Sequence, residues 1–290
     1  MTTHEFTHIG LSGCELQLIT NKVIRKKSPS IYYNDRLQKQ LNKQLLFKSI
    51  NTNIHVPKVL ANGYSNDLFY FDMEYIDGNL FSKEFITVSK PSLDAYVYSI
   101  ISYINETEHV AVDVYSEDEL KTILTNKLIS LKETSNYTEL LLQTIDFVNS
   151  KTFSSIKKGT CHGDLTLSNI LFSNGNIYLL DFLDSYIESY IIDIVKLKQD
   201  LYYNWNVSLV PFDSSLEGRI KQVFRYMWGI LEENYGDIIN TDLFNILDLI
   251  NLLRIEPYTK TEVQKNLLHT LLQQTKLYEK FNNSNDGQIN

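Results

Sequence analysis

The sequence predicts an α+β protein in two parts, a small β-rich part over residues 1–76 and a larger, mainly helical part over residues 77–290. Three observations support this prediction. Before Gly78, short apolar runs with the period of two that is typical of strands are separated by turn residues. After Gly78, apolar residues recur at helical spacing. One short β-like island at 160–182 interrupts the helical patterns.

The β-rich part is expected to contain five strands and one helix in the order βββαββ. Runs of Val, Ile, Leu and aromatic residues indicate the strands, and apolar residues at near-helical spacing among Gln, Lys and Asn indicate the helix. The expected elements are three strands within Phe6–Lys26, a helix over 32–50, and strands over 56–60 and 68–76.

The larger part is expected to consist mainly of helices. The segment Pro91–Asn105 carries its apolar residues on one face, and Ser116 with Glu119 has the pattern of a capping box that opens the next helix. Further helical patterns follow near 190–205, 215–234, 240–253 and 260–281.

Composition and charge restrict the class of protein. Apolar residues make up 43% and charged residues 21% of the 290 residues, with 11 Gly and 5 Pro, which excludes a disordered or collagen-like chain. The net charge of −8 argues against nucleic acid as a partner, because such a protein must neutralise a run of phosphates. Residues 1–10 lack a secretory apolar core, and no apolar stretch reaches about eighteen residues. We therefore expect a soluble, cytoplasmic protein without a membrane partner.

Three polar side chains of the island carry its chemistry. Asp164 and Asn169 bracket a loop, whereas Asp181 ends an apolar strand, where a carboxylate without a cationic partner would be costly. Together with His162 and Phe182 they have the spacing H-x-D-x-x-x-x-N followed by D-F. An Asp that accepts a hydroxyl proton, with an Asn and a second Asp as oxygen ligands, is what phosphoryl transfer from a Mg²⁺-bound nucleotide requires.

The island resembles the H-G-D-x-x-x-x-N loop and the D-F metal motif of the aminoglycoside phosphotransferase and choline kinase family. The preceding βββαββ pattern and the helical second part are similar to that family as well. The resemblance implies a two-lobed protein-kinase-like fold and a phosphotransferase with an alcohol group as acceptor, with ATP or GTP and Mg²⁺ as cofactors. The residues that it assigns are Asp164 as the catalytic base, Asn169 and Asp181 as metal ligands, and the backbone of Glu74, Tyr75 and Ile76 as the adenine contact.

The nucleotide phosphates are expected beside the first three strands. The turn from Gly10 to Gly13 can bring backbone N–H groups close to a phosphate, although an ordinary hairpin has the same pattern. At the end of the third strand, Lys26 has the spacing of the strand lysine of kinases. A shift in register by one residue leaves Arg25 or Lys27 as the alternative.

One feature departs from the kinase pattern. The helix after the third strand offers Gln38, Gln40 and Gln44, but no Glu that could pair with the strand lysine. A Gln can accept a hydrogen bond from an ammonium group, but without a charge it orients that group less strongly. This departure keeps open an alternative function, a pseudokinase that binds a nucleotide without catalysis.

The acceptor is expected to be a small molecule. Gly163 stands where protein kinases have Arg, Leu183 replaces the Gly of D-F-G, and no long activation segment follows. An amino alcohol, an aminoglycoside or a sugar fits this pattern, and a protein kinase is the least favoured alternative. The segment 254–258 either lines the acceptor or caps a helix. Asp184 and Glu188 are left either as contacts to substrate or metal, or as alternatives to Asp164 as the base, or as ordinary surface acids.

Overall fold

The structure is a computed structural model that describes residues 7–9, 13–49, 53–80, 88–208 and 214–286. Its contacts divide the chain into two compact units. Unit 1 consists of Met1–Glu106 and His162–Asp184, and unit 2 consists of Thr107–Cys161 and Ser185–Asn290. The island with the predicted catalytic residues is therefore packed in the same unit as the β-rich start of the chain.

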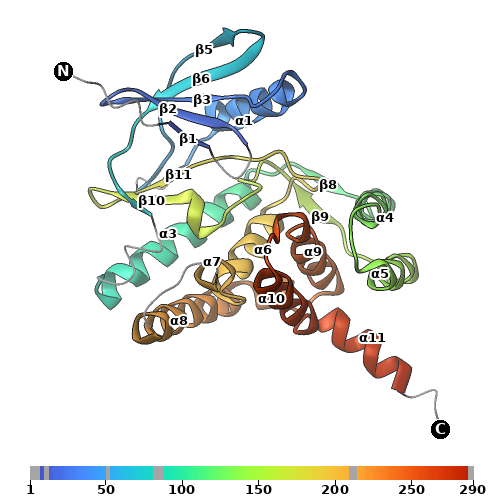
Figure 1. Cartoon of the computed structure of the whole chain (residues 1–290). Helices are drawn as coiled ribbons and strands as arrows, with labels where there is room; N and C mark the ends of the chain where they lie inside the picture. Colours follow the sequence, from blue (N-terminus) through green and yellow to red (C-terminus); the bar gives the residue numbers. More distant parts are fainter. Residues whose placement is uncertain (1–6, 10–12, 50–52, 81–87, 209–213, 287–290) are drawn as a thin grey trace. The chain divides into compact units, whose positions relative to one another are not determined.

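Unit 1 begins with a five-stranded antiparallel sheet in the order β1-β2-β3-β6-β5 (Figure 1). The three strands expected before Lys27 are present. The strands are β1 (Thr7–Ile9), β2 (Glu15–Thr20), β3 (Val23–Lys27), β5 (Val59–Ser65) and β6 (Leu68–Glu74).

The prediction of a strand over 56–60 is wrong, because β5 begins at Val59 and continues to Ser65. The turn between β5 and β6 explains the difference. Asn66 and Asp67 both have positive φ, at 52° and 63°, which is the conformation of a tight two-residue hairpin turn. This turn pairs Ser65 with Leu68, and the pairing of β5 with β6 then continues as far as Val59 and Met73. The low strand propensity of the Ala-Asn-Gly run within β5 is thereby overridden.

The helix α1 (Asn34–Leu46) follows a 3-10 turn, η1 (Ile31–Tyr33), and ends before the predicted limit of residue 50. Beyond its end, the Phe47 ring packs against the rings of Tyr103 and Phe182. The helix packs on β6 and shares a core with the sheet. The buried members of this core are Cys14, Leu37, Leu41, Phe69, Phe71 and Met73.

A second sheet of unit 1 has the order β4-β11-β10-β7 and contains the predicted β-like island. Its strands are β4 (Ile54–His55), β7 (Asn79–Leu80), β10 (Ile170–Ser173) and β11 (Asn176–Leu179). A tight turn at Asn174 and Gly175 joins β10 to β11, and the two strands pair Ile170 with Leu179. This register brings the residue before β10 opposite the residues after β11. The helix α3 (Lys90–His109) then begins close to the predicted position.

Unit 2 is mainly helical, as expected after Gly78. The predicted capping box at the start of α4 is present, with Ser116 and Glu119 bonded reciprocally. Beyond the predicted elements, β8 (Asp113–Tyr115) pairs with β9 (Ile156–Lys158). The helices are α4 (Glu117–Lys132), α5 (Thr138–Ser150), α6 (Tyr190–Leu201), α7 (Trp205–Ser208), α8 (Ser214–Ile239), α9 (Asp242–Leu253), η3 (Glu256–Tyr258), α10 (Glu262–Gln273) and α11 (Lys276–Asp286).

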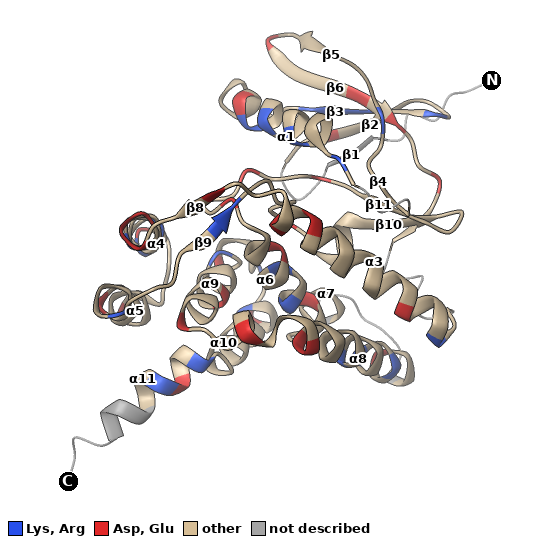
Figure 2. Cartoon of the chain, turned by 180° about the vertical axis from the view of Figure 1, so that it is seen from behind, with Lys and Arg blue, Asp and Glu red and all other residues tan. Residues whose placement is uncertain are grey.

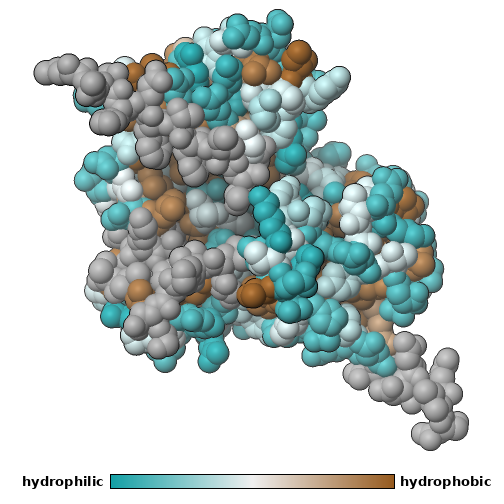
Figure 3. Space-filling view, in the orientation of Figure 1, coloured by the Kyte–Doolittle hydropathy of each residue, from teal (hydrophilic) through white to brown (hydrophobic). Residues whose placement is uncertain are grey.

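The helices of unit 2 differ in how much of their surface is buried. Every residue of α6 is buried, whereas α4 buries only Leu120, Leu124, Leu128 and Leu131 at helical spacing. The outer surface around α4 and α5 is accordingly mainly hydrophilic on the face drawn in Figure 3. Among the described residues, no helix is long and apolar enough to cross a lipid bilayer.

The shared core of α1 and the sheet gives a first testable prediction. Leu37→Ala should lower the free energy of unfolding by about 2–5 kcal/mol, because it leaves a cavity at a fully buried position. Leu46→Ala on the same helix is the matched control, since Leu46 is 70% exposed, and it should change stability by less than about 0.5 kcal/mol. Urea unfolding followed by circular dichroism measures both. Equal losses in the two variants would contradict the packing of α1 described here.

Candidate active site

Lys26 and Asp181, 155 residues apart in sequence, form an ion pair in unit 1. The Lys26 Nζ atom lies 2.9 Å from Asp181 Oδ1 and 2.9 Å from Gln40 Oε1 of α1. The Lys26 side chain is 3% exposed, whereas that of Asp181 is 43% exposed. Burial opposes the charge of Lys26, yet the adjacent carboxylate outweighs this effect and raises the pKa of Lys26 above its ordinary value. The ammonium group therefore stays charged beside a carboxylate that solvent can reach.

The register of β3 decides between the three basic residues at its end. Arg25 points to the other face of the sheet, where its guanidinium binds both oxygens of Asp72 at 2.7 and 2.9 Å and stacks on the Tyr70 ring. Lys26 points to α1 and is the residue next to Asp181. The geometry thus favours Lys26 over Arg25 or Lys27.

The loop from His162 to Asn169 is held by hydrogen bonds within itself. The Asn169 side-chain amide donates to the backbone oxygen of Asp164 at 2.8 Å and to its carboxylate Oδ2 at 3.0 Å. The backbone N–H of Asp164 in turn donates to His162 Nδ1 at 3.2 Å. These bonds fix the Asp164 carboxylate relative to Asn169.

The β10–β11 hairpin places Asn169 next to the segment that carries Asp181. Its register continues beyond the strands, since the Leu180 N–H donates to the Asn169 backbone oxygen at 2.9 Å. The structure therefore brings together four of the predicted site residues, namely Lys26, Asp164, Asn169 and Asp181.

The oxygen atoms left over in this arrangement suit a magnesium ion. The side-chain amide nitrogen of Asn169 donates to Asp164, and Asp181 accepts from Lys26 through Oδ1. Within the described ranges of the chain, no hydrogen bond engages the side-chain oxygen of Asn169 or the second carboxylate oxygen of Asp181. In the described part of the chain no three His, Cys, Asp or Glu side chains cluster as a metal cage. Mg²⁺ does not need such a cage, because it is commonly held by one or two protein oxygens together with water and substrate phosphates.

Gly163 has a conformational and a steric reason for being glycine. Its φ is +81°, and a Cβ atom there would overlap the backbone oxygen of Leu183. The Leu183 N–H donates to the backbone oxygen of His162 at 2.9 Å, so the two segments run in close contact. The residue that distinguishes this loop from the H-R-D loop of protein kinases is thus required by its local packing.

Two alternative acids are engaged in other contacts. Asp184 forms a 2.8 Å ion pair with Lys39 of α1 in unit 1. In unit 2, the Glu188 carboxylate accepts hydrogen bonds from the Ser185 N–H and from the thiol of Cys161, at 2.8 and 3.5 Å. The two hydrogen bonds occupy both carboxylate oxygens of Glu188 and favour Asp164 over Glu188 as the base, whereas the exposed pair of Asp184 does not decide between Asp184 and Asp164.

The expected nucleotide contacts are described in part. Gly10 lies outside the described residues, and Gly13 precedes β2 with φ of +79°. The backbone N–H groups of Glu74 and Tyr75 already donate hydrogen bonds to the backbone oxygens of Lys58 and Lys22, respectively. The Ile76 N–H has no hydrogen-bond acceptor among the described residues and remains the available backbone donor in this segment.

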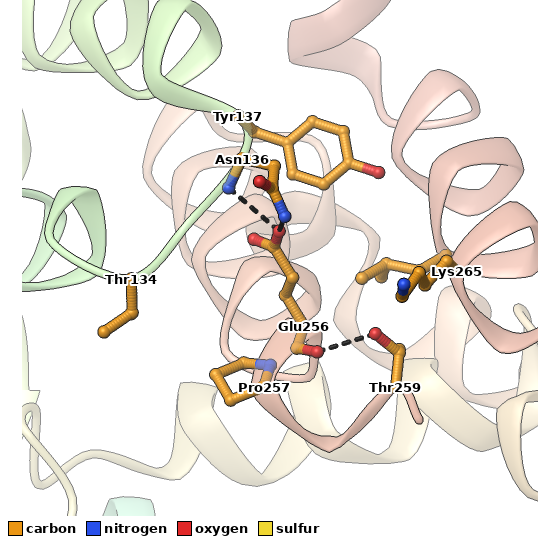
Figure 4. A pocket seen from close by; sticks show the side chains of 8 residues that line it. Thr134, Asn136, Tyr137, Glu256, Pro257, Thr259 and Lys265 are labelled. Atoms are coloured by element: carbon orange, nitrogen blue, oxygen red, sulfur yellow. Dashed lines mark hydrogen bonds between the residues drawn. The ribbon is translucent and has the colours of Figure 1, made fainter. Parts of the chain in front are cut away.

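Of the segment 254–258, Glu256 and Pro257 line a pocket of about 340 Å³ in unit 2 (Figure 4). In this pocket the Glu256 carboxylate accepts hydrogen bonds from Ser135 Oγ, from the Asn136 N–H and from the Asn136 side-chain amide. Both carboxylate oxygens thus hold the turn between α4 and α5 to η3. These contacts support the structural alternative for this segment over the acceptor-binding one.

The sequence pattern alone did not distinguish Gln40 from the other glutamines of α1 as the partner of Lys26. Lys39 and Lys43 were not among the predicted site residues. The signal was present in the helical period, since Gln40 and Gln44 fall on the buried face with Leu37 and Leu41. A polar residue at such a position needs a partner, and for Gln40 the partner is Lys26.

A family model described as "Phosphotransferase enzyme family" matches residues 18–211, more than half of the chain and all four clustered residues. The chain belongs to this family. The expectation of a phosphotransferase with an alcohol group as acceptor is thereby confirmed at the level of the enzyme class. No curated protein matches the sequence.

Three solved structures illustrate the similarity in fold. The GDP and kanamycin complex of APH(2")-IIia has a TM-score of 0.59 at 15% identity, covering 94% of this chain and 92% of that chain. The streptomycin-ATP-APH(2")-IIa ternary complex has a TM-score of 0.51 at 15% identity, covering 94% and 92%. A protein described as a fructosamine-3-kinase from Haemophilus somnus 129PT has a TM-score of 0.55 at 14% identity, covering 92% and 90%. These similarities confirm the protein-kinase-like fold predicted from the island.

The His162 imidazole of this phosphotransferase is neutral by virtue of its surroundings. It is fully buried, its Nε2 lies 2.7 Å from the backbone oxygen of Leu180, and its Nδ1 accepts from the Asp164 N–H. Because the Leu180 oxygen can only accept, Nε2 carries the proton. Burial lowers the pKa of His162 to about 4 from an ordinary value of 6.5.

This neutral histidine predicts a pH dependence of stability. Between pH 6.5 and about 4 the unfolded chain binds a proton on His162 that the folded chain does not. As the pH is lowered through this range, the free energy of unfolding should therefore decrease by up to about 3 kcal/mol. Urea unfolding at about pH 7 and about pH 4.5 should show this loss, and His162→Gln should reduce it. His269→Gln, at an exposed position, is the control. An unchanged loss in His162→Gln would refute the assignment.

A further prediction separates the two constraints on Gly163. Gly175 has nearly the same φ, +79°, but an added Cβ there would meet no atom within 4 Å, so Gly175→Ala should cost only the backbone strain of about 1–2 kcal/mol. Gly163→Ala adds the clash with Leu183 and should cost about 1–3 kcal/mol more. Urea unfolding of the two variants gives the difference. If both variants lose the same stability, the close contact of Gly163 with Leu183 is not present in solution.

Proposed function

We propose that the chain is a small-molecule kinase that uses ATP or GTP with Mg²⁺ to transfer the γ-phosphate to a hydroxyl group of a small acceptor. The observation that carries the proposal is the ion pair of Lys26 with Asp181, beside the loop that holds Asp164 and Asn169. The family match and the phosphate-transfer motif point to the same chemistry.

Asp164 is assigned as the base that takes the proton of the acceptor hydroxyl. It is the only acid of the loop 162–169, and Asn169 and the His162 ring fix its position. The buried, neutral His162 is a structural support in this proposal, because its two ring nitrogens are already bonded within unit 1. A base held in this way can accept the proton as the phosphoryl group is transferred.

Asn169 and Asp181 are the proposed ligands of Mg²⁺, and Lys26 is the proposed contact to the nucleotide phosphates. The ion would supply positive charge against the phosphate oxygens as the γ-phosphate is transferred. Lys26 is held by Gln40 on one side and Asp181 on the other, so its ammonium group stands beside the metal ligand. Lys26 and the ion would both supply positive charge against the phosphates.

The nucleotide base is proposed to contact the backbone of Glu74, Tyr75 and Ile76, with the Ile76 N–H as the donor. The turn from Gly10 to Gly13 is proposed to approach the phosphates. This assigns nucleotide binding to an N-terminal lobe at residues 1–76 and catalysis and acceptor binding to residues 77–290. Unit 1 contains the first of these lobes together with residues 162–184.

The acceptor is proposed to be an amino alcohol, an aminoglycoside or a sugar. Structures of similar fold include complexes with the small molecules kanamycin, streptomycin and gentamicin, and a protein described as a fructosamine-3-kinase. The short connection from Asp184 to α6 at Tyr190 leaves no room for the long activation segment of protein kinases. A protein acceptor is therefore disfavoured.

The test is nucleotide consumption against a panel of amino alcohols, aminoglycosides and sugars, with ATP and GTP, in the presence and absence of Mg²⁺. We expect Mg²⁺-dependent turnover with at least one acceptor. Asp164→Asn should lower kcat about 10²- to 10⁴-fold with little change in nucleotide affinity, because it removes a positioned base. Asp146→Asn, at an exposed position on α5, is the matched control and should leave kcat unchanged.

Two results would contradict this proposal. Full kcat in Asp164→Asn, with loss of activity in Asp184 or Glu188 variants, would show that the base is another acid. Mg²⁺-dependent nucleotide binding without turnover of any acceptor would favour the pseudokinase alternative instead.

A further inference from the structure

The helix α1 contacts the segment Asp181–Asp184 through more than the Gln40–Lys26 bond. Lys43 donates a hydrogen bond from Nζ to the backbone oxygen of Leu183, and Lys39 forms its ion pair with Asp184. Basic residues accordingly gather on β3 and α1 in Figure 2. We propose that Lys43 is a positioning residue that fixes the segment carrying Asp181 and thereby sets the affinity of the site for its divalent metal ion.

The position of the Lys43 ammonium group supports this role. Nζ binds Leu183, whose own N–H binds the backbone oxygen of His162, so one cation stands where the catalytic loop meets the metal-binding segment. Lys43 Nζ also lies 3.4 Å from the position that a Cβ atom at Gly163 would occupy. The absence of a side chain at Gly163 therefore leaves room for both the Leu183 carbonyl and the Lys43 ammonium group.

The backbone of Asp181 provides an independent reason for such a brace. Its φ is +58°, in the left-handed region, which Asp adopts more readily than most residues other than glycine but still at some cost in backbone free energy. Contacts that restrain the neighbouring chain help to hold such a conformation. Two residues further along, the Lys43 bond to Leu183 is such a contact, since it restrains the chain immediately after the strained residue.

The charges on α1 explain why a lysine is suited to this task. In kinases a helix Glu pairs with the strand lysine, but here the corresponding partner is the neutral Gln40. The charged residues that α1 presents here are instead the cations Lys39 and Lys43. They contact a segment that carries two carboxylates, Asp181 and Asp184. Of these cations, Lys39 is 61% exposed and its pair with Asp184 contributes little, whereas Lys43 is half-buried and bonds the backbone itself.

The inference rests on the proposed function for its metal, and it predicts a specific defect. Lys43→Met keeps the apolar stem and removes the donor. The segment should then relax, and the carboxylate of Asp181 should lose the orientation that the metal requires. Nucleotide contacts that do not involve the metal should be unaffected, because Lys43 does not belong to them.

The test uses the full chain with Mn²⁺ as a paramagnetic probe and the non-hydrolysable analogue AMP-PNP. Electron paramagnetic resonance should show Mn²⁺ affinity about tenfold to hundredfold weaker in Lys43→Met, as expected for the loss of a hydrogen bond from a charged group. Lys43→Arg should restore most of it, and Lys48→Met, an exposed lysine just after α1, is the control. AMP-PNP affinity without metal should be the same in all four chains. Wild-type Mn²⁺ affinity in Lys43→Met would overturn the inference.

Hydrogen exchange without any ligand separates this inference from the proposed function. Exchange at residues 180–184 should be faster in Lys43→Met than in the wild type and the Lys48→Met control. If the wild type fails to bind Mn²⁺ and AMP-PNP, the proposed function fails, and faster exchange would still support Lys43 as the brace of this segment. Unchanged exchange would overturn that role whatever the nucleotide result.

Discussion

The ion pair between Lys26 and Asp181 is the interaction on which the arrangement of the site depends. A buried ammonium group requires an opposite charge or strong acceptors, and Lys26 has Asp181 on one side and Gln40 on the other. The pair joins the end of β3 to the segment after β11, two elements of different sheets. The helix α1 holds both partners, through Gln40 on the first and Lys43 on the segment of the second.

The remainder of the site is built onto this pair by short-range constraints. The β10–β11 register sets Asn169 against Leu180, and Asn169 holds Asp164. The contact of Gly163 with Leu183 closes the loop 162–169 onto the segment Asp181–Asp184. The four residues, which have three proposed tasks between them, are thus positioned by one hairpin, one helix and one glycine.

The island could be predicted from the sequence because its spacing is local. Asp164, Asn169 and Asp181 lie within eighteen positions of one another, and the hairpin that orients them contains its own turn residues. Lys26 could be predicted from strand alternation, although its register against Arg25 needed the sheet. The same alternation failed for β5, whose limits follow from the turn at Asn66 and Asp67 and from pairing with β6. The roles of Gln40 and Lys43 depend on tertiary contacts that local patterns do not encode. For Lys43, the contact residue is more than a hundred positions away in sequence.

We propose that Lys26 and Asp181 act as one unit on a metal-bound nucleotide. The most direct measurement is a double-mutant cycle with Lys26→Met and Asp181→Asn, using the affinity for AMP-PNP with Mg²⁺ in the four chains. We expect each single variant to weaken binding and the double variant to lose clearly less than the sum, with a coupling energy of about 1 kcal/mol or more. Losses that add within about 0.5 kcal/mol would show that the two residues act independently and would contradict their joint role.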